Sequence, residues 1–231
     1  MDSFYLGAYW GSRQESVEQC GHRLASCLGR LSEIDEAFES WFRRGVRKTA
    51  AKTPVELDVE SLSGLLAQGV NRRDVGGDVI EELGYSVGLW NRARPAVGFS
   101  ATVGAHPSFM GVLNSVVFDF PRPEAEALRL YEPRVAGAVI DAVVESWEPN
   151  WATWTTHAWR SAQKVASREP VVGWMTYLST SSTVECAGIT SRALLGGTVY
   201  AIGQSVNDVG ERSVLELRGC LASTGALGPI S

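Results

Sequence analysis

Three short segments in the middle of the chain constrain its fold more than any other feature. Residues 84–91, 97–104 and 113–120 are each rich in Val, Phe, Tyr or Trp, and each is bounded by Gly, Pro or Asn. Such segments are typical of strands. In series they indicate an antiparallel meander, and the polar, glycine-containing residues 71–82 before it are predicted to form a loop.

Helical periodicity is present on both sides of this meander. Apolar residues recur every three or four positions over 13–31 and over 133–147, which predicts two amphipathic helices. Ser12 and Glu15 fit a capping box at the start of the first helix. Further helices are predicted at 35–44, 59–68 (capped by Asp58), 158–167 and 208–222.

The remaining segments complete the predicted fold class. Strands are predicted at 3–10, 170–178 and 198–203, whereas 150–158 fits a strand or a turn and 179–197 is a loose Ser/Thr/Gly stretch. We therefore expect an α+β fold, a mostly antiparallel sheet with helices packed on it. The 231 residues suit a single domain, and if it has two lobes their boundary is near 121–133.

Charge excludes some classes of function. The formal net charge is −5, and phosphate binding needs a basic face, so nucleic acid is not expected as a direct partner. Restriction-type nucleases commonly carry an acid two residues before a Lys. None of the three Lys here has one, which argues against the chain being such a nuclease.

The chain also lacks signals for export or membrane insertion. No basic segment followed by an apolar segment is visible at its start, and the nearly apolar run 135–144 is too short to span a bilayer. We expect a cytoplasmic location and no membrane partner. The cysteines show no zinc-type spacing and are interpreted as small buried residues. They are Cys20, Cys27, Cys186 and Cys220.

Few residues are arranged for catalysis. The chain has no Walker A, GxGxxG or HExxH motif, and Ser161 to Lys164 matches SxxK without its companion motifs. Of the three histidines, only His157 lies within a Trp cluster, which spans Trp147 to Trp159. A hydrolase-like site or a small-molecule-binding module there is the alternative function. We expect no catalytic residue, metal site or cofactor.

Several segments, taken in order, match a known pattern. They are Ala8-Tyr9-Trp10-Gly11 with Arg13 and Glu15-Ser16, then Asn71-Arg72-Arg73-Asp74 with Gly76-Gly77 and Ile80-Glu81-Glu82-Leu83-Gly84, then Trp147-Glu148-Pro149-Asn150-Trp151-Ala152, and 170–178. In this order and spacing the chain resembles the Immunity protein 52 family of bacterial polymorphic-toxin systems. Two features depart from the family: Ser12 stands where Pro is expected, and 179–197 is hard to align.

The resemblance implies a non-enzymatic antidote whose partner is a cognate secreted toxin. Toxins paired with such proteins include ones with a restriction-endonuclease-like fold delivered by type VI secretion. The acidic charge of the chain suits an inhibitor that docks on a basic nuclease cleft. No family motif marks the toxin-contacting residues, so none is carried over to this sequence.

Contact residues are therefore hypotheses from charge and aromatic content. The first is the acidic outer face of 33–39 together with the 74–82 loop, and the second is the Trp-rich segment 147–159. For each residue, plain solvated surface or aromatic core is the alternative reading. The candidates are Glu36, Glu39, Asp74, Asp78, Glu81, Glu82, Trp151 and Trp154. The sequence leaves the oligomeric state open.

Overall fold

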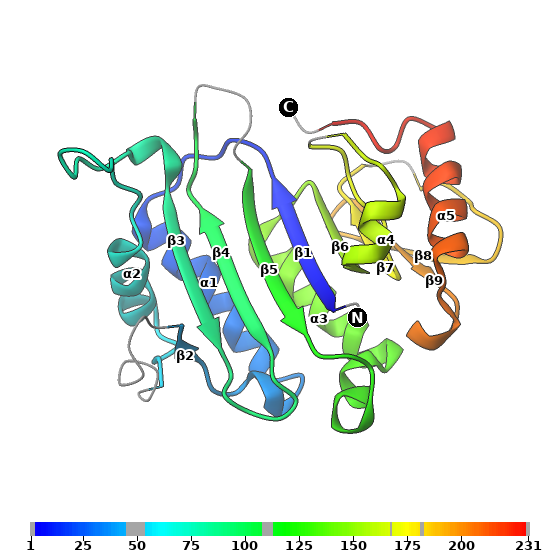
Figure 1. The fold of residues 1–231 in the computed structure, drawn as a ribbon, viewed down its shortest axis with the longest axis horizontal. Coiled ribbons are helices and arrows are strands. Elements are labelled where there is room, and N and C mark those ends of the chain that lie inside the picture. Colours follow the sequence, from blue (N-terminus) through cyan, green and yellow to red (C-terminus); the bar gives the residue numbers. More distant parts are fainter. Residues whose placement is uncertain (1–2, 45–53, 108–112, 167, 181–182, 230–231) are drawn as a thin grey trace.

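A computed structural model describes residues 3–44, 54–107, 113–166, 168–180 and 183–229. Its centre is a nine-stranded sheet in the order β2-β3-β4-β5-β1-β6-β7-β9-β8, in which every pair of neighbours is antiparallel. β1 lies in the middle and pairs with β5 on one side and β6 on the other (Figure 1). The α+β fold with a mostly antiparallel sheet is thus confirmed.

The strands and helices have the following bounds. The strands are β1 (Phe4–Trp10), β2 (Phe42–Arg43), β3 (Tyr85–Trp90), β4 (Gly98–Val103), β5 (Asn114–Phe120), β6 (Trp151–Thr156), β7 (Met175–Leu178), β8 (Ile189–Leu194) and β9 (Gly197–Ile202). The α-helices are α1 (Val17–Ser32), α2 (Val59–Gln68), α3 (Pro133–Trp147), α4 (His157–Ala162) and α5 (Glu211–Ser223). Short 3-10 helices include η1 (Glu36–Phe38) and η3 (Glu81–Leu83).

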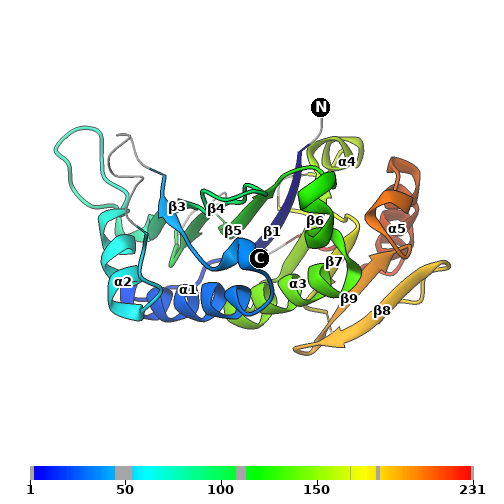
Figure 2. The same ribbon diagram turned by 90° about the horizontal axis from the view of Figure 1, so that it is seen from below.

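The larger core lies between one face of the sheet and helices α1 and α3 (Figure 2). Side chains alternate between the two faces of a strand, so Leu6 of β1, Phe118 of β5 and Trp154 of β6 share the buried face. Trp154 stacks on Phe120 with ring centroids 4.4 Å apart. Aromatic rings therefore pack together with Leu, Val and Ala side chains in the main core.

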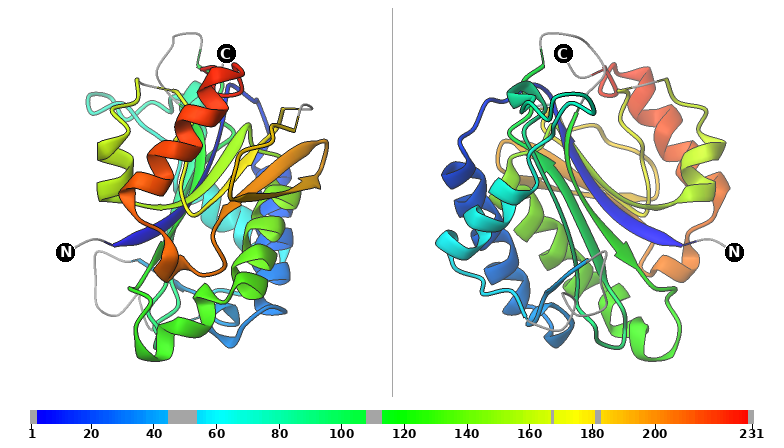
Figure 3. Two further views of the ribbon diagram at one scale, coloured as in Figure 1. Left: turned by 90° about the vertical axis from the view of Figure 1, so that its right-hand side faces the viewer. Right: turned by 60° about the vertical axis from the view of Figure 1, so that its left-hand side comes forward.

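A second core lies on the opposite face, over one half of the sheet only. Val214, Leu217 and Leu221 of α5 pack against residues of β6, β7 and β9, and α4 lies beside α5 on this side (Figure 3). A disulfide between Cys186 and Cys220 joins the segment before β8 to α5. The interpretation of these two cysteines as buried thiols is therefore wrong, whereas Cys20 and Cys27 are buried free thiols.

Two predictions near the start of the chain are corrected. The capping box of α1 is formed by Ser16 and Gln19, because Glu15 is held by arginines instead. The predicted helix 35–44 is a single 3-10 turn, η1, followed by the edge strand β2. Pairing of Phe42 with Trp90 of β3 draws this segment onto the sheet, which a helix would prevent.

Differences in the second half are smaller, with one strand missed. The predicted loop 179–197 contains β8, which forms a hairpin with β9. The predicted helix near 158–167 is α4, and the predicted strand 170–178 is reduced to β7. Residues 121–133, named as a possible lobe boundary, connect β5 to α3. No helix in the described part of the chain is long and apolar enough to cross a membrane.

Candidate functional site

Half of one sheet face has no helix over it among the described residues (Figures 1 and 2). Residues paired across antiparallel strands point to the same side, so the strand register gives the composition of this uncovered face on β3, β4, β5 and β1. Its three rows are Ser86-Thr102-Ser115-Tyr9, Gly88-Ser100-Val117-Gly7 and Trp90-Gly98-Asp119-Tyr5. Small and hydroxyl-bearing side chains therefore make up most of this floor.

A side chain crosses two of the floor glycines, and at Gly98 it leaves no space for a Cβ atom. The Arg44 side chain lies over Gly88 and Gly98 and donates to the Asp119 carboxylate at 3.2 Å. A Cβ atom on Gly98 would approach Nη2 of Arg44 to 1.9 Å, so any larger residue there would displace the arginine. The Arg44–Asp119 pair thus limits the uncovered face at one end of the strands.

One side of the uncovered face is bounded by the loop 71–84, which rises above the sheet (Figure 2). Backbone hydrogen bonds from Arg73 to Asp78 and from Ile80 to Asn71 close the loop as a narrow hairpin, and Val75 at its tip is 88% exposed. The loop carries two arginines and four carboxylates, so it is net negative. No ion pair between described residues includes Asp74, Asp78, Glu81 or Glu82.

The other side is bounded by α4, and a pocket of about 490 Å³ lies between this helix and the sheet. Tyr5, Tyr9 and Trp151 line it from the sheet, and Arg160 and Lys164 line it from α4 and the residues that follow. Burial raises the pKa of the Tyr5 hydroxyl, and the hydrogen-bonded Arg160 partly offsets that shift. This side of the uncovered face is thus aromatic and cationic.

The predicted acidic surface divides into two separate groups. Glu36 and Glu39 lie at η1, beside the β2–β3 pairing at the end of β3, whereas the 71–84 loop enters β3 at its beginning. The length of β3 separates them, roughly 17 Å. Glu36 also has a partner, Arg129 at 3.0 Å. Only the loop group lies beside the uncovered face.

The two predicted tryptophans point to opposite faces of β6. Trp151 stacks on Tyr9 with ring centroids 4.7 Å apart and lines the α4 pocket. Trp154 is 0% exposed in the main core, so it offers a partner no surface in this conformation. Strand alternation explains the difference once β6 is known to be a strand rather than a turn.

His157 has surroundings that do not favour chemistry. It is exposed, and its ring lies 5.0 Å from that of Tyr5. Among the described residues, neither a nucleophile nor an orienting carboxylate contacts His157, and a catalytic histidine needs both. Within the described residues, no group of three or more His, Cys, Asp or Glu could hold a metal ion.

Sequence reasoning missed a buried ionic group at one end of the sheet. Glu15, whose side chain is 8% exposed, accepts from Arg13 at 3.0 Å and from Arg23 at 2.6 Å. The two arginines also donate to the carbonyls of Trp147 and Ser146, the last residues of α3. Such carbonyls lack partners within the helix. Arg13, Glu15 and Trp147 belong to the segments that resemble the family, and in the structure they form a structural contact.

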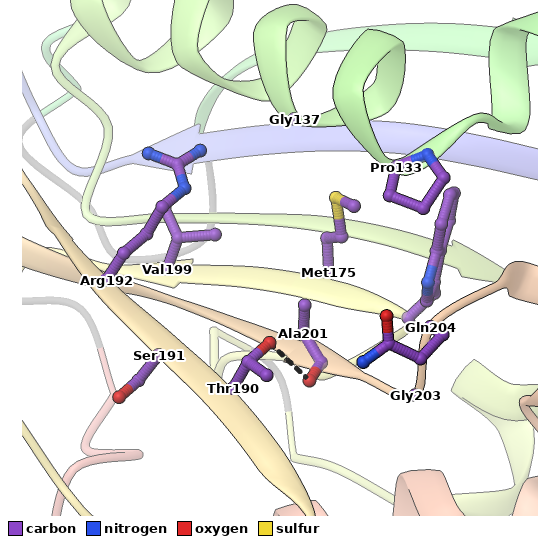
Figure 4. A pocket seen from close by; sticks show the side chains of 11 residues that line it. Pro133, Gly137, Met175, Thr190, Ser191, Arg192, Val199, Ala201, Gly203 and Gln204 are labelled. Atoms are coloured by element: carbon purple, nitrogen blue, oxygen red, sulfur yellow. Dashed lines mark hydrogen bonds between the residues drawn. The ribbon is translucent and has the colours of Figure 1, made fainter.

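A second cavity, of about 260 Å³, lies between the start of α3 and strands β7, β8 and β9 (Figure 4). Two of its polar side chains are already engaged, since Arg192 binds Asp141 and Thr190 donates to the Ala201 carbonyl at 3.3 Å. No histidine, cysteine or carboxylate is among the described residues that line it. The cavity therefore lacks an acid–base pair.

Comparisons with known proteins agree with this architecture. A solved structure described as Pseudomonas aeruginosa T6SS protein PA0821 aligns with a TM-score of 0.56 at 12% identity, covering 96% of this chain and 73% of that one. At that identity the likeness shows the fold. No curated protein sequence matches the chain. The model of the family described as Immunity protein 52 matches residues 2–185. The chain therefore belongs to the Immunity protein 52 family.

Proposed function

We propose that this protein binds one cognate secreted toxin and blocks it by occlusion, without catalysing a reaction. Membership of an immunity-protein family supports the antidote role. The observation that carries the mode of inhibition is the raised loop 71–84 beside the uncovered sheet face. It presents four carboxylates, which form no ion pair with another described residue, around the exposed apolar tip Val75. An acidic rim around an apolar contact is a common interface arrangement.

The proposed toxin is a nuclease with a restriction-endonuclease-like fold, delivered by type VI secretion. A nuclease cleft is basic because it binds phosphates. An acidic loop complements such a cleft, which speeds encounter and disfavours wrong partners. Asp74, Asp78, Glu81 and Glu82 would then compete with nucleic acid for the toxin. Glu36 and Glu39 remain a second acidic candidate, and Trp151 is the one predicted tryptophan that lines a pocket.

The proposed place of action is the cytoplasm, where a nuclease meets its substrate. The Cys186–Cys220 disulfide is the observation against this location, because thiols are kept reduced there. Trapping the thiols in living cells and counting the oxidised cysteines tests the location. A fully oxidised pair in the native host would contradict a cytoplasmic site and would point to export.

Charge reversal in the two acidic groups tests the binding surface. One variant carries Asp78→Lys, Glu81→Lys and Glu82→Lys, and the other carries Glu36→Lys and Glu39→Lys. We expect the loop variant to bind the purified cognate toxin more weakly and with an altered salt dependence. The η1 variant should match wild type, because it changes the other end of β3.

Three outcomes are distinct. Equal binding by wild type and both variants, with one salt dependence, would contradict the acidic-loop surface. Loss in the η1 variant alone would move the surface to Glu36 and Glu39. Failure of the wild-type protein to protect cells that express the toxin encoded beside its gene would contradict the immunity role itself.

A further inference from the structure

The pocket beside α4 is locally positive, opposite in sign to the net charge of the chain. The chain has a net charge of −5, yet Arg160, Lys164 and Arg168 all line this one pocket. Its single carboxylate, Glu169, is bound to Arg218 at 3.0 Å. Arg160 and Lys164 are exposed on the pocket wall. A local cationic site on an acidic protein selects for an anionic ligand.

The sheet side of the pocket contains a polar group with an unmet hydrogen bond. Trp151 is 4% exposed and lines the pocket, and its indole Nε1 has no hydrogen-bond partner among the described residues. Two positions along β6, the buried Thr153 hydroxyl also has none. An indole N–H can only donate, and a buried unpaired donor lowers stability. The Trp151 ring therefore lines the pocket, while its Nε1 atom is itself buried.

The position of the pocket indicates what brings an anionic ligand to it. Helix α4, which lines the pocket, lies across the uncovered face from the acidic loop 71–84 (Figure 2), and β3, β4, β5 and β1 lie between them. The spacing of these strands places the two sides roughly 14 Å or more apart. A partner seated on the hydroxyl-rich floor would meet negative charge on one side and positive charge on the other.

We propose that the α4 pocket binds an acidic side chain of the cognate toxin, so that the toxin is held at two oppositely charged points and in one orientation. A carboxylate fits the site because it can accept from both Arg160 and Lys164, which line the pocket and are exposed. This inference rests on the toxin-binding role proposed above. It adds a cationic contact to the anionic contact made by the acidic loop. A second contact of opposite charge explains how one toxin with a mainly basic surface is distinguished from others.

Paired charge reversals test the contact. Arg160→Glu and Lys164→Glu each place a negative charge in the pocket. Arg134→Glu, an exposed arginine at the start of α3 with no ion pair among the described residues, is the matched control. Calorimetric titration with the purified toxin should show about tenfold or greater weakening for either pocket variant. The control should bind like wild type.

Nuclear magnetic resonance tests the pocket in the wild-type protein, so its result does not depend on whether a charge-reversal variant folds. Nitrogen-15 labelling of the tryptophans gives separate indole signals, and Trp151→Phe identifies the one from the pocket. Toxin binding should shift the Trp151 signal because this ring lines the pocket, whereas the signal of Trp147 in the main core should not move. Titration with sodium glutamate alone provides the small-anion comparison.

Each result decides one way. Weakened binding by both pocket variants with a shifted Trp151 signal supports the proposal. Wild-type affinity in both variants, or an unmoved Trp151 signal in a complex that forms, overturns it and leaves the immunity role intact. A Trp151 signal shifted by glutamate but not by toxin also overturns it, and assigns the pocket to a small anion. Absence of any wild-type complex contradicts the proposed function instead.

Discussion

Glu15 holds two arginines against the end of helix α3. Glu15→Ala would leave Arg13 without a carboxylate partner and Arg23 with only Glu148, and removing one partner of a buried pair costs about 3–5 kcal/mol. Both arginines keep 25% of their side chains exposed, so we expect about 2 kcal/mol. Urea denaturation measures this change. The control Glu216→Ala breaks the exposed Arg212–Glu216 pair, which is worth about 0–1 kcal/mol, and an equal loss there would contradict the role of Glu15.

Asp35 makes stability depend on pH. Burial disfavours its ionised form, but hydrogen bonds from Arg129 and from the Ala37 N–H hold the pKa of Asp35 below its ordinary value. A carboxyl with a lowered pKa adds stability that is complete above the unfolded value, roughly 3.9, and is lost as pH falls through the folded one. Asp35→Asn should therefore be less stable than wild type at neutral pH.

That deficit should shrink as pH falls below about 4, because Asp35 of the unfolded wild type becomes protonated there and folded Asp35 follows at its lowered pKa. The free energies of unfolding of both proteins at neutral pH and at acidic pH measure it. Glu39→Gln, which removes an exposed carboxylate without an ion pair among the described residues, is the control. If Asp35→Asn is less stable than wild type by the same free energy at both pH values, the packing and hydrogen bonds of the Asp35 side chain matter rather than its ionisation.

At the scale of elements, the disulfide fastens β8 to α5. It joins cysteines 34 positions apart, and closing a loop of that length stabilises the folded state by about 4 kcal/mol in the chain-entropy model. Burial raises the pKa of the Cys20 and Cys27 thiols to about 12, so both should resist alkylation in the native state.

We therefore expect purified native protein to label at no cysteine, unfolded protein at two, and unfolded reduced protein at four. Mass spectrometry after alkylation counts the labels. The double variant Cys186→Ser and Cys220→Ser should unfold at lower urea concentration than wild type. Four labels without reductant would show that the bond is absent from the isolated protein.

Elements were predictable where one local signal was sufficient. Helix α2 begins at Asp58 and ends before Gly69 as the caps require, and the meander follows from its turn residues. The segment 35–44 was wrongly predicted as a helix because its buried Phe38 and Trp41 have helical spacing. Its end instead pairs with β3 as strand β2. β8 is an exposed edge strand, so it lacks the apolar alternation that marks buried strands.

At the scale of the molecule, the site was predictable only in part. The acidic loop was visible in the sequence because its charges are contiguous. The α4 pocket was not, since it combines Tyr5, Trp151 and Lys164, which lie far apart in the chain. The same distance hid the Cys186–Cys220 contact. Trp151 and Trp154 look alike in sequence, and only the placement of helices over the sheet separates the pocket-lining ring from the core ring.

The uncovered face makes a prediction about the whole complex. Ser100 lies in the middle row of the floor, between Gly88 and Val117, so Ser100→Arg would place a long side chain where the toxin is proposed to sit. The face is open to solvent, so stability should change by about 0.5 kcal/mol or less. Toxin binding should weaken about tenfold or more, because a toxin held at both sides cannot tilt away from the obstacle.

Ser191→Arg is the matched control. Ser191 is also an exposed strand serine, but it lies on the edge strand β8, away from the uncovered face. Thermal melting shows whether each variant folds, and titration with the toxin gives the affinities. Unchanged affinity in a folded Ser100→Arg protein would mean that the toxin does not cover the floor. The acidic loop and the α4 pocket would then not be bridged over the middle row of the floor, in which Ser100 lies.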